Sequence, residues 1–307
     1  MRGNRVATDG APGATLLTGG LGYIGSHVAA AIREEHGVTS VVHLAGRKSA
    51  PESVLRPAWY FQQNIGALAC VLEAMAQAGV GHLVFSSSAA VYGPTTGGAL
   101  KEAHPIAPAN PYGMTKAVCE QLLQAAVAQG LRATSLRYFN VLGASSELRA
   151  EQHGTKLIPR VLSALSTEGA AEVFGDEHPT ADGTCVRDYV HVVDLAQAHV
   201  RALSAVMGEA RIAPAYNIGT GTGYSVAQVL DELGAVLGRP VPRVISPARA
   251  GDPAEVVAAV DLAKVDLAWV AQRDLTTMLS DAVESGPSAW RRLRSAGPDL
   301  VDGRLAT

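Results

Sequence analysis

The chain has 307 residues, of which 48% are hydrophobic, and a formal net charge of −3. This length can bury one large core or two lobes that share a cleft, and so small a charge gives no reason to expect nucleic acid or an anionic membrane as a partner. No apolar run is long enough to span a membrane, and the N-terminus lacks a signal-peptide layout. The three cysteines have neither the spacing of a disulfide framework nor that of a metal site. We therefore expect a cytoplasmic globular protein.

The first part of the chain alternates strand-like and helix-like segments. Short apolar runs predict strands at 14–18, 41–44, 82–86 and 133–137. Apolar residues at helical spacing predict helices from 26, over 68–78 and over 112–129. Alternation of this kind is typical of parallel βαβ units, so we expect an α/β fold built on a doubly wound parallel sheet.

A second region is expected beyond the polar, irregular segment 143–156, which we interpret as a hinge. There the pattern predicts a strand at 186–191, a helix from 193 and another helix over 225–237. The segment 246–253 is expected to be a loop.

Three glycines separate the first strand from the first helix. Gly19, Gly22 and Gly25 are three residues apart, the spacing of a dinucleotide-binding turn. Such glycines let the backbone approach a pyrophosphate, and the helix that follows offers free N–H groups to the phosphates. The alternative is a tight strand–helix turn without a ligand.

Tyr112 and Lys116 are four residues apart and therefore share one face of the predicted helix. An ammonium group beside a phenol favours the phenolate, so we expect Lys116 to lower the pKa of Tyr112. Ser88 could hydrogen-bond the same substrate oxygen. These side chains suit proton transfer to and from an alcohol that is being oxidised. The spacing alone also occurs by chance on many helices.

Further sequence blocks accompany these residues along the chain. They are T-G-G-L-G-Y-I-G-S-H at 18–27, H-L-A-G-R-K at 43–48, F-S-S-S-A-A-V-Y-G at 85–93, P-Y-G-M-T-K at 111–116, R-Y-F-N at 137–140, D-G-T-C-V-R-D-Y-V-H-V-V-D-L-A at 182–196 and A-R-A-G-D at 248–252. With these blocks the chain resembles the extended short-chain dehydrogenase/reductase superfamily, and within it the UDP-glucose 4-epimerases. The resemblance implies a Rossmann-type sheet with a smaller α/β substrate-binding domain.

The resemblance further implies an isomerase that binds NAD and interconverts UDP-glucose and UDP-galactose. In that scheme the sugar is oxidised at C4 and the resulting keto sugar rotates. The hydride then returns to the opposite face of the sugar. Tyr112 would take the proton of the 4-hydroxyl group, and Lys116 would adjust the pKa of Tyr112. Ser88 would form a bridging hydrogen bond to the same substrate oxygen. The implied partners are a UDP-sugar and, in a homodimer, a second copy of the chain; no metal is implied.

Ligand-binding residues and domains are also implied by the resemblance. The residues for NAD are Gly19, Gly22, Tyr23, Ile24, Gly25, Lys48, Asn64, Ser86, Tyr112, Lys116 and Tyr138. The residues for the UDP-sugar are Ser88, Asn140, Lys156, Phe174, Arg187, Arg249 and Asp252. The implied domains are an NAD-binding domain of residues 1–140 plus about 184–206, and a UDP-sugar-binding domain of about 141–183 plus 207–307.

One departure from the family pattern is large, because only twenty residues separate Gly25 from Gly46. The second and third strands of the sheet normally lie there, together with the acidic residue that binds the adenosine ribose. Two explanations stay open. Either the sequence omits a segment of the gene product, or the sheet lacks these strands, its first strand lies at an edge and NAD binding is impaired. The intact Ser88, Tyr112 and Lys116 favour the first explanation.

Two other functions also stay open. The chain could act on another nucleotide sugar, such as a UDP-N-acetylhexosamine, because Val256 is a small residue near a position that gates sugar size in the family. It could instead be a degenerate relative that binds a sugar nucleotide without catalysis. Ala89 and Ala90 stand where dehydratases usually have an Asp-Glu pair, which disfavours dehydration.

Overall fold

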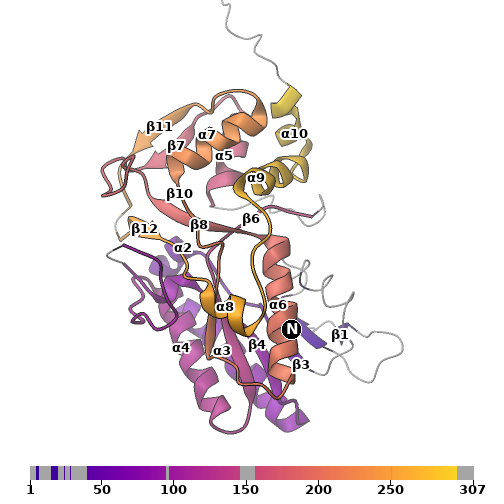
Figure 1. The fold of residues 1–307 in the computed structure, drawn as a ribbon. Helices are drawn as coiled ribbons and strands as arrows, with labels where there is room; N and C mark the ends of the chain where they lie inside the picture. Colours follow the sequence, from indigo (N-terminus) through magenta and orange to yellow (C-terminus); the bar gives the residue numbers. More distant parts are fainter. Residues whose placement is uncertain are drawn as a thin grey trace, which may run out of the picture.

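The computed structural model describes residues 5–6, 15–19, 24, 28, 40–94, 97–145, 156–249 and 251–295. Within these ranges the chain forms two lobes (Figure 1). One lobe is built on a large sheet, and the other combines two smaller sheets with short helices. None of the described helices is long and apolar enough to cross a membrane.

The large sheet has six strands in the order β1-β2-β3-β4-β5-β9. They are β1 (Arg5–Val6), β2 (Thr15–Thr18), β3 (Ser40–His43), β4 (His82–Ser88), β5 (Arg132–Tyr138) and β9 (Ala215–Ile218). All pairs from β2 to β9 are parallel, as expected for a Rossmann-type α/β fold. The predicted fold class is therefore confirmed.

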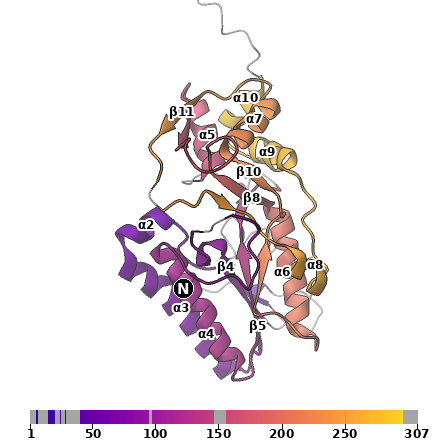
Figure 2. The same ribbon diagram turned by 60° about the vertical axis from the view of Figure 1, so that its left-hand side comes forward.

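Helices cover both faces of this sheet. α3 (Pro57–Ala78) and α4 (Pro111–Val127) lie side by side on one face, and α6 (Val192–Met207) lies on the other (Figure 2). Val41 packs with the core beneath α3 and α4, whereas its neighbour Val42 packs with the core beneath α6. Because such strands are buried on both faces, their sequences are continuous apolar runs.

The second lobe contains a four-stranded and a two-stranded sheet. In the first, β6 (Asn140–Leu142), β10 (Gly223–Ser225) and β12 (Glu255–Val256) all pair with β8 (Val186–His191). In the second, β7 (Ala171–Phe174) and β11 (Arg243–Ser246) are parallel. One apolar core joins these sheets to α5 (Leu157–Leu165), α7 (Val226–Leu237), α9 (Leu275–Glu284) and α10 (Ser288–Ser295). Three short helices elsewhere are α2 (Ala50–Leu55), η1 (Ala89–Val91) and α8 (Asp261–Asp266).

The structure corrects the expected division of the chain between the lobes. β9 was assigned by sequence to the second domain, but it pairs with β5 in the large sheet, and α8 packs against it. The chain returns to the edge of the large sheet after α6 before it re-enters the second lobe. Conversely, β8 was assigned to the first domain but forms the centre of the four-stranded sheet.

The beginning of the large sheet differs from expectation in one respect. β2 is not an edge strand, because β1 pairs with it in antiparallel orientation. β2 pairs directly with β3, so no strand lies between them in the sheet. Of the residues that connect β2 to β3, the structure describes only Gly19, Ile24 and Val28. The segment on which the two explanations of the short connection differ lies outside the described residues.

Candidate functional site

A cavity of about 400 Å³ lies between the lobes, beyond the carboxyl ends of β4 and β5. In open parallel sheets this is the edge at which ligands bind. The sequence-predicted residues that line the cavity are Ile24, Lys48, Ser88, Tyr112, Tyr138, Asn140, Lys156, Phe174, Arg187, Arg249 and Asp252. Four others, Gly19, Asn64, Ser86 and Lys116, are not part of its wall. Gly22, Tyr23 and Gly25 lie outside the described residues.

Two features fix the start of α4 and thereby place Tyr112 at the cavity. The side chain of Asn110 accepts a 2.9 Å hydrogen bond from the backbone N–H of Gly113, which caps the helix. Gly113 lies directly against η1, since a Cβ at this position would be 2.4 Å from the carbonyl oxygen of Ala90. Only glycine permits this close approach, which brings the first turn of α4 beside Ser88 at the end of β4.

Ser88 connects the end of β4 to the phenol of Tyr112. Its Oγ accepts a 3.2 Å hydrogen bond from the backbone N–H of Ala90, and its hydroxyl group hydrogen-bonds Tyr112. Burial raises the pKa of Tyr112 above its ordinary value, and the hydrogen bond from Ser88 opposes part of this rise. Tyr112 therefore keeps its proton near neutral pH and has a neighbour that stabilises the phenolate.

Lys116 stands one turn after Tyr112, and only 5% of its surface is exposed. Its Nζ donates a 2.6 Å hydrogen bond to the carbonyl oxygen of Ser86 and lies 4.8 Å from the centre of the Phe85 ring. Burial lowers the pKa of Lys116 to about 8. The expectation that Lys116 lowers the pKa of Tyr112 is wrong for this state, because the ammonium group is directed at Ser86 and burial of the phenol dominates.

We expect Lys116→Met to raise the melting temperature most strongly below pH 8. The pKa of Lys116 falls from 10.5 to about 8 on burial, so folding penalises its protonated form by roughly 2 to 4 kcal/mol. This penalty is complete below pH 8 and fades as the pH rises toward 10.5, and the advantage of the variant fades with it. Thermal unfolding of both proteins across this range is the measurement; a difference that does not change with pH would contradict the expectation.

Gly19 shows how closely the ends of β2 and β3 approach each other. Its φ is +78°, and a Cβ here would lie 2.9 Å from the backbone nitrogen of Ala45. A side chain is therefore excluded by the backbone that follows β3, and glycine is the residue type that a dinucleotide turn has at this point. The backbone at Gly19, with Lys48 and Tyr112 of the cavity wall, forms a cradle whose residue types fit the pyrophosphate and nicotinamide parts of NAD.

Asn64 supports the cavity from behind. Its Oδ1 accepts a 2.7 Å hydrogen bond from the backbone N–H of Arg47, and its Nδ2 donates to the Arg47 carbonyl oxygen and to Oγ1 of Thr115 on α4, at 3.1 and 2.9 Å. The side chain thus ties the loop after β3 to α4. This loop carries Lys48 at the cavity wall, so Asn64 holds a wall residue in place.

Two arginines stand at the end of the cavity formed by the second lobe. The guanidinium group of Arg187 donates to the carboxylate of Asp252 at 2.9 Å and to the carbonyl oxygen of Val186 at 2.8 Å. The guanidinium group of Arg249 lies 3.7 Å over the Phe174 ring. Planar, permanently charged groups of this kind suit the bidentate binding of phosphates.

Hydrogen bonds of Asp182 fix the turn that leads into β8, the strand that carries Arg187. Asp182 accepts hydrogen bonds from the backbone N–H and the hydroxyl group of Thr184, at 2.9 and 2.8 Å, and from Ser225. Partial burial raises the pKa of Asp182, but these hydrogen bonds outweigh it and keep that pKa below its ordinary value.

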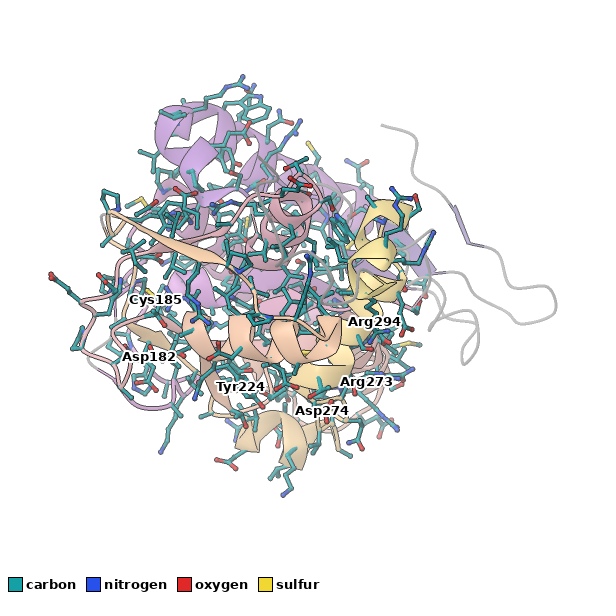
Figure 3. The ribbon with its side chains drawn as sticks, turned by 90° about the horizontal axis from the view of Figure 1, so that it is seen from above. Asp182, Cys185, Tyr224, Arg273, Asp274 and Arg294 are labelled. Atoms are coloured by element: carbon teal, nitrogen blue, oxygen red, sulfur yellow. The ribbon has the colours of Figure 1, made fainter. Side chains whose placement is uncertain are left out.

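Figure 3 shows Asp182 and Cys185 together, on the opposite side of the lobe from Arg294. Cys185 lines the cavity, with its Sγ 3.3 Å from Nε2 of His178.

Several wall residues were not predicted from the sequence. They are Arg160, Glu172, Cys185, Tyr189 and Trp290. Arg160 forms a 2.5 Å ion pair with Glu172 and lies 4.8 Å over the Phe174 ring. The amphipathic pattern of α5 is the only signal for Arg160. Cys185 and Tyr189 stand in the block at 182–196, and no motif marks Glu172 or Trp290. Val256 packs in the cluster with Phe139 and is not part of the cavity wall.

Comparison with known proteins gives a consistent result. Residues 30–219 match the NAD dependent epimerase/dehydratase family. The chain is 41% identical over 312 residues to a UDP-glucose 4-epimerase of Corynebacterium glutamicum, covering 87% of this chain and 94% of that protein. It is also 41% identical to a UDP-glucose 4-epimerase of Streptomyces lividans, over 80% of this chain and 74% of that protein.

Solved structures show the same similarity. The UDP-glucose 4-epimerase of Stenotrophomonas maltophila, crystallised with NAD and formylated UDP-arabinopyranose, superposes with a TM-score of 0.83 at 35% identity, covering 92% of this chain and 98% of that one. The Brucella ovis UDP-glucose 4-epimerase in complex with NAD superposes with a TM-score of 0.81 at 34% identity, covering 87% of this chain and 96% of that one.

Proposed function

Because the chain belongs to the NAD dependent epimerase/dehydratase family, we propose that it interconverts UDP-glucose and UDP-galactose with NAD as cofactor. One cavity supports this proposal most directly. It has the proton-transfer pair Ser88 and Tyr112 at one end and the cations Arg187 and Arg249 at the other. A nucleotide sugar fits this arrangement when its diphosphate lies at the arginines and its hexose at the tyrosine. The large-sheet lobe then binds NAD, and the second lobe binds the nucleotide.

In this proposal the residues of the chain control the proton on the sugar 4-oxygen. Tyr112 first releases its own proton to solvent; as a phenolate, which a hydrogen bond from Ser88 stabilises, it then takes the 4-hydroxyl proton. Lys116 contributes a positive charge on the same helix face. NAD, held by the large-sheet lobe, would supply the hydride chemistry at C4 of the sugar. Tyr112 then gives the proton back to the 4-oxygen, so no net oxidation results.

A panel of substrates tests this function. Purified protein with added NAD is incubated with UDP-glucose, UDP-galactose or UDP-N-acetylglucosamine, and the products are separated by anion-exchange chromatography. We expect UDP-glucose and UDP-galactose to interconvert, and the N-acetylated sugar to react more slowly. Failure to convert either hexose would contradict the proposal. A preference for the N-acetylated sugar would favour the other substrate class, although Val256 does not line the cavity.

We also propose that the protein is a cytoplasmic homodimer of galactose metabolism that associates through the outward faces of α3 and α4. These helices lie side by side on the outside of the sheet (Figure 2). Their exposed faces carry one charged side chain, Glu73, because Lys116 and Glu120 are buried. Phe61 and Met114 are 37% and 41% exposed. An extended surface with so little charge is typical of protein–protein interfaces.

Ala69→Glu is expected to convert the dimer to a monomer, because it places a carboxylate in the centre of the exposed face of α3. Size-exclusion chromatography with light scattering measures the mass. Ala235→Glu, on the exposed side of α7 in the second lobe, is the matched control and should leave the mass unchanged. If Ala69→Glu has the mass of the wild-type protein, this face is not the interface.

A further inference from the structure

Tyr138 has a buried partner that the proposed reaction does not use. It ends β5 and lines the cavity, yet only 8% of its surface is exposed. Its hydroxyl oxygen lies 2.5 Å from Nε2 of His199, a residue of α6 with no exposed surface. The two rings are 5.5 Å apart at an interplanar angle of 61°, so the hydroxyl group points at the edge of the imidazole.

The second nitrogen of His199 determines the direction of this hydrogen bond. Nδ1 is 2.8 Å from the carbonyl oxygen of Leu195, and because a carbonyl oxygen only accepts, Nδ1 carries the hydrogen. Burial lowers the pKa of His199 to about 4, so the ring is neutral near pH 7. Nε2 then has a lone pair and must accept the hydrogen of the Tyr138 hydroxyl group.

The only hydrogen of the Tyr138 hydroxyl group therefore points away from the cavity. Its oxygen can act toward all other neighbours only as an acceptor, and the side chain of Ser86 hydrogen-bonds it. Burial and the nearby Tyr112 raise the pKa of Tyr138 above its ordinary value. Tyr138 thus keeps its proton, which stays in the hydrogen bond to His199.

We propose that His199 is a positioning residue that fixes Tyr138 as a hydrogen-bond acceptor at the cavity wall, where it takes an N–H or O–H donor of a bound ligand. This inference rests on the proposed function for the identity of the ligand. The donor is either the carboxamide of NAD or a hydroxyl group of the sugar. Both offer the same chemistry, and the two are distinguished by experiment.

The test compares Tyr138→Phe, His199→Phe, the double variant and His199→Gln. NAD affinity is measured by calorimetry, and KM for UDP-glucose by steady-state kinetics. Loss of one hydrogen bond with a buried group is expected to raise either the dissociation constant of NAD or KM for UDP-glucose about tenfold in each phenylalanine variant. A weaker NAD affinity assigns the donor to the cofactor, and a raised KM assigns it to the sugar. His199→Gln, whose amide oxygen can accept from Tyr138, should restore most of the loss.

Because His199 acts only through Tyr138, the double variant is expected to match Tyr138→Phe alone. Trp269→Phe is the control for stability. It removes a buried 2.9 Å hydrogen bond to the carbonyl oxygen of Asp194 on α6, away from the cavity, and should leave both constants unchanged. Additive losses in the double variant, or His199→Phe with wild-type constants, would overturn the inference. A wild-type protein that neither binds NAD nor converts UDP-glucose would instead overturn the proposed function.

Discussion

Replacing Tyr112 with phenylalanine is expected to lower kcat for epimerisation by roughly a thousandfold, which lies within the range contributed by positioned proton-transfer groups. The phenyl ring occupies the same space at the start of α4, and only the hydroxyl group that Ser88 contacts is lost. The arginines at the other end of the cavity are unchanged, so binding of the UDP-sugar should persist. Steady-state kinetics and calorimetry with UDP-glucose measure the two effects separately.

Tyr216→Phe is the matched control for this variant. The Tyr216 hydroxyl group accepts from the backbone N–H of Ala213 at 2.9 Å and donates to Asp266 at 3.1 Å, and it does not line the cavity. Its loss should lower stability without lowering kcat. If Tyr112→Phe converted UDP-glucose at a rate close to that of the control, Tyr112 would not be the group that moves the proton.

Arg187→Met is expected to raise KM for UDP-glucose about a hundredfold, because it removes a charged partner of the diphosphate and leaves the carboxylate of Asp252 unpaired. Arg187 is well suited to this role since its side chain is only 13% exposed, which limits screening by water. NAD affinity should be preserved, because the cradle at the end of β2 belongs to the other lobe. Steady-state kinetics and NAD calorimetry provide both readouts.

The control is Arg243→Met, which breaks the ion pair with Asp231 at the surface of the second lobe. Surface pairs of this kind contribute little, so KM should stay near the wild-type value. Asp252→Asn separates charge from geometry, because Arg187 keeps its charge while its carboxylate partner is lost. We expect an effect smaller than that of Arg187→Met. Equal KM values for Arg187→Met and Arg243→Met would exclude Arg187 from diphosphate binding.

The strands β2 to β5 of the large sheet could be predicted from the sequence because they form continuous apolar runs, whereas β1 and β9 were not predicted. The runs at 41–44, 82–86 and 133–137 correspond to β3, β4 and β5, each within two residues of the observed bounds. In the second lobe the predicted strand at 186–191 corresponds to β8, whereas the shorter strands β6, β7, β10, β11 and β12 were not predicted. β12, for example, has two residues and is defined only by its pairing with β8, far away in the chain. Local patterns contain no information about such pairing.

The same limit applies to the site. Ser88, Tyr112 and Arg187 stand in motifs, and the structure places all three at one cavity. The direction of the pKa shift of Tyr112 could not be predicted, since it depends on burial of the phenol in the folded chain. His199 also escaped sequence reasoning, because its contact with Tyr138 joins α6 to β5 and follows no spacing rule.

The most direct test of the account uses UDP-glucose labelled with deuterium at C4. Wild-type protein with NAD is incubated with it in ordinary water, and the product is examined by NMR. We predict UDP-galactose that retains the deuterium at C4, because the hydride leaves and returns within one cavity while only the proton on the 4-oxygen passes through Tyr112. Absence of UDP-galactose, or UDP-galactose with hydrogen from water at C4, would contradict the account.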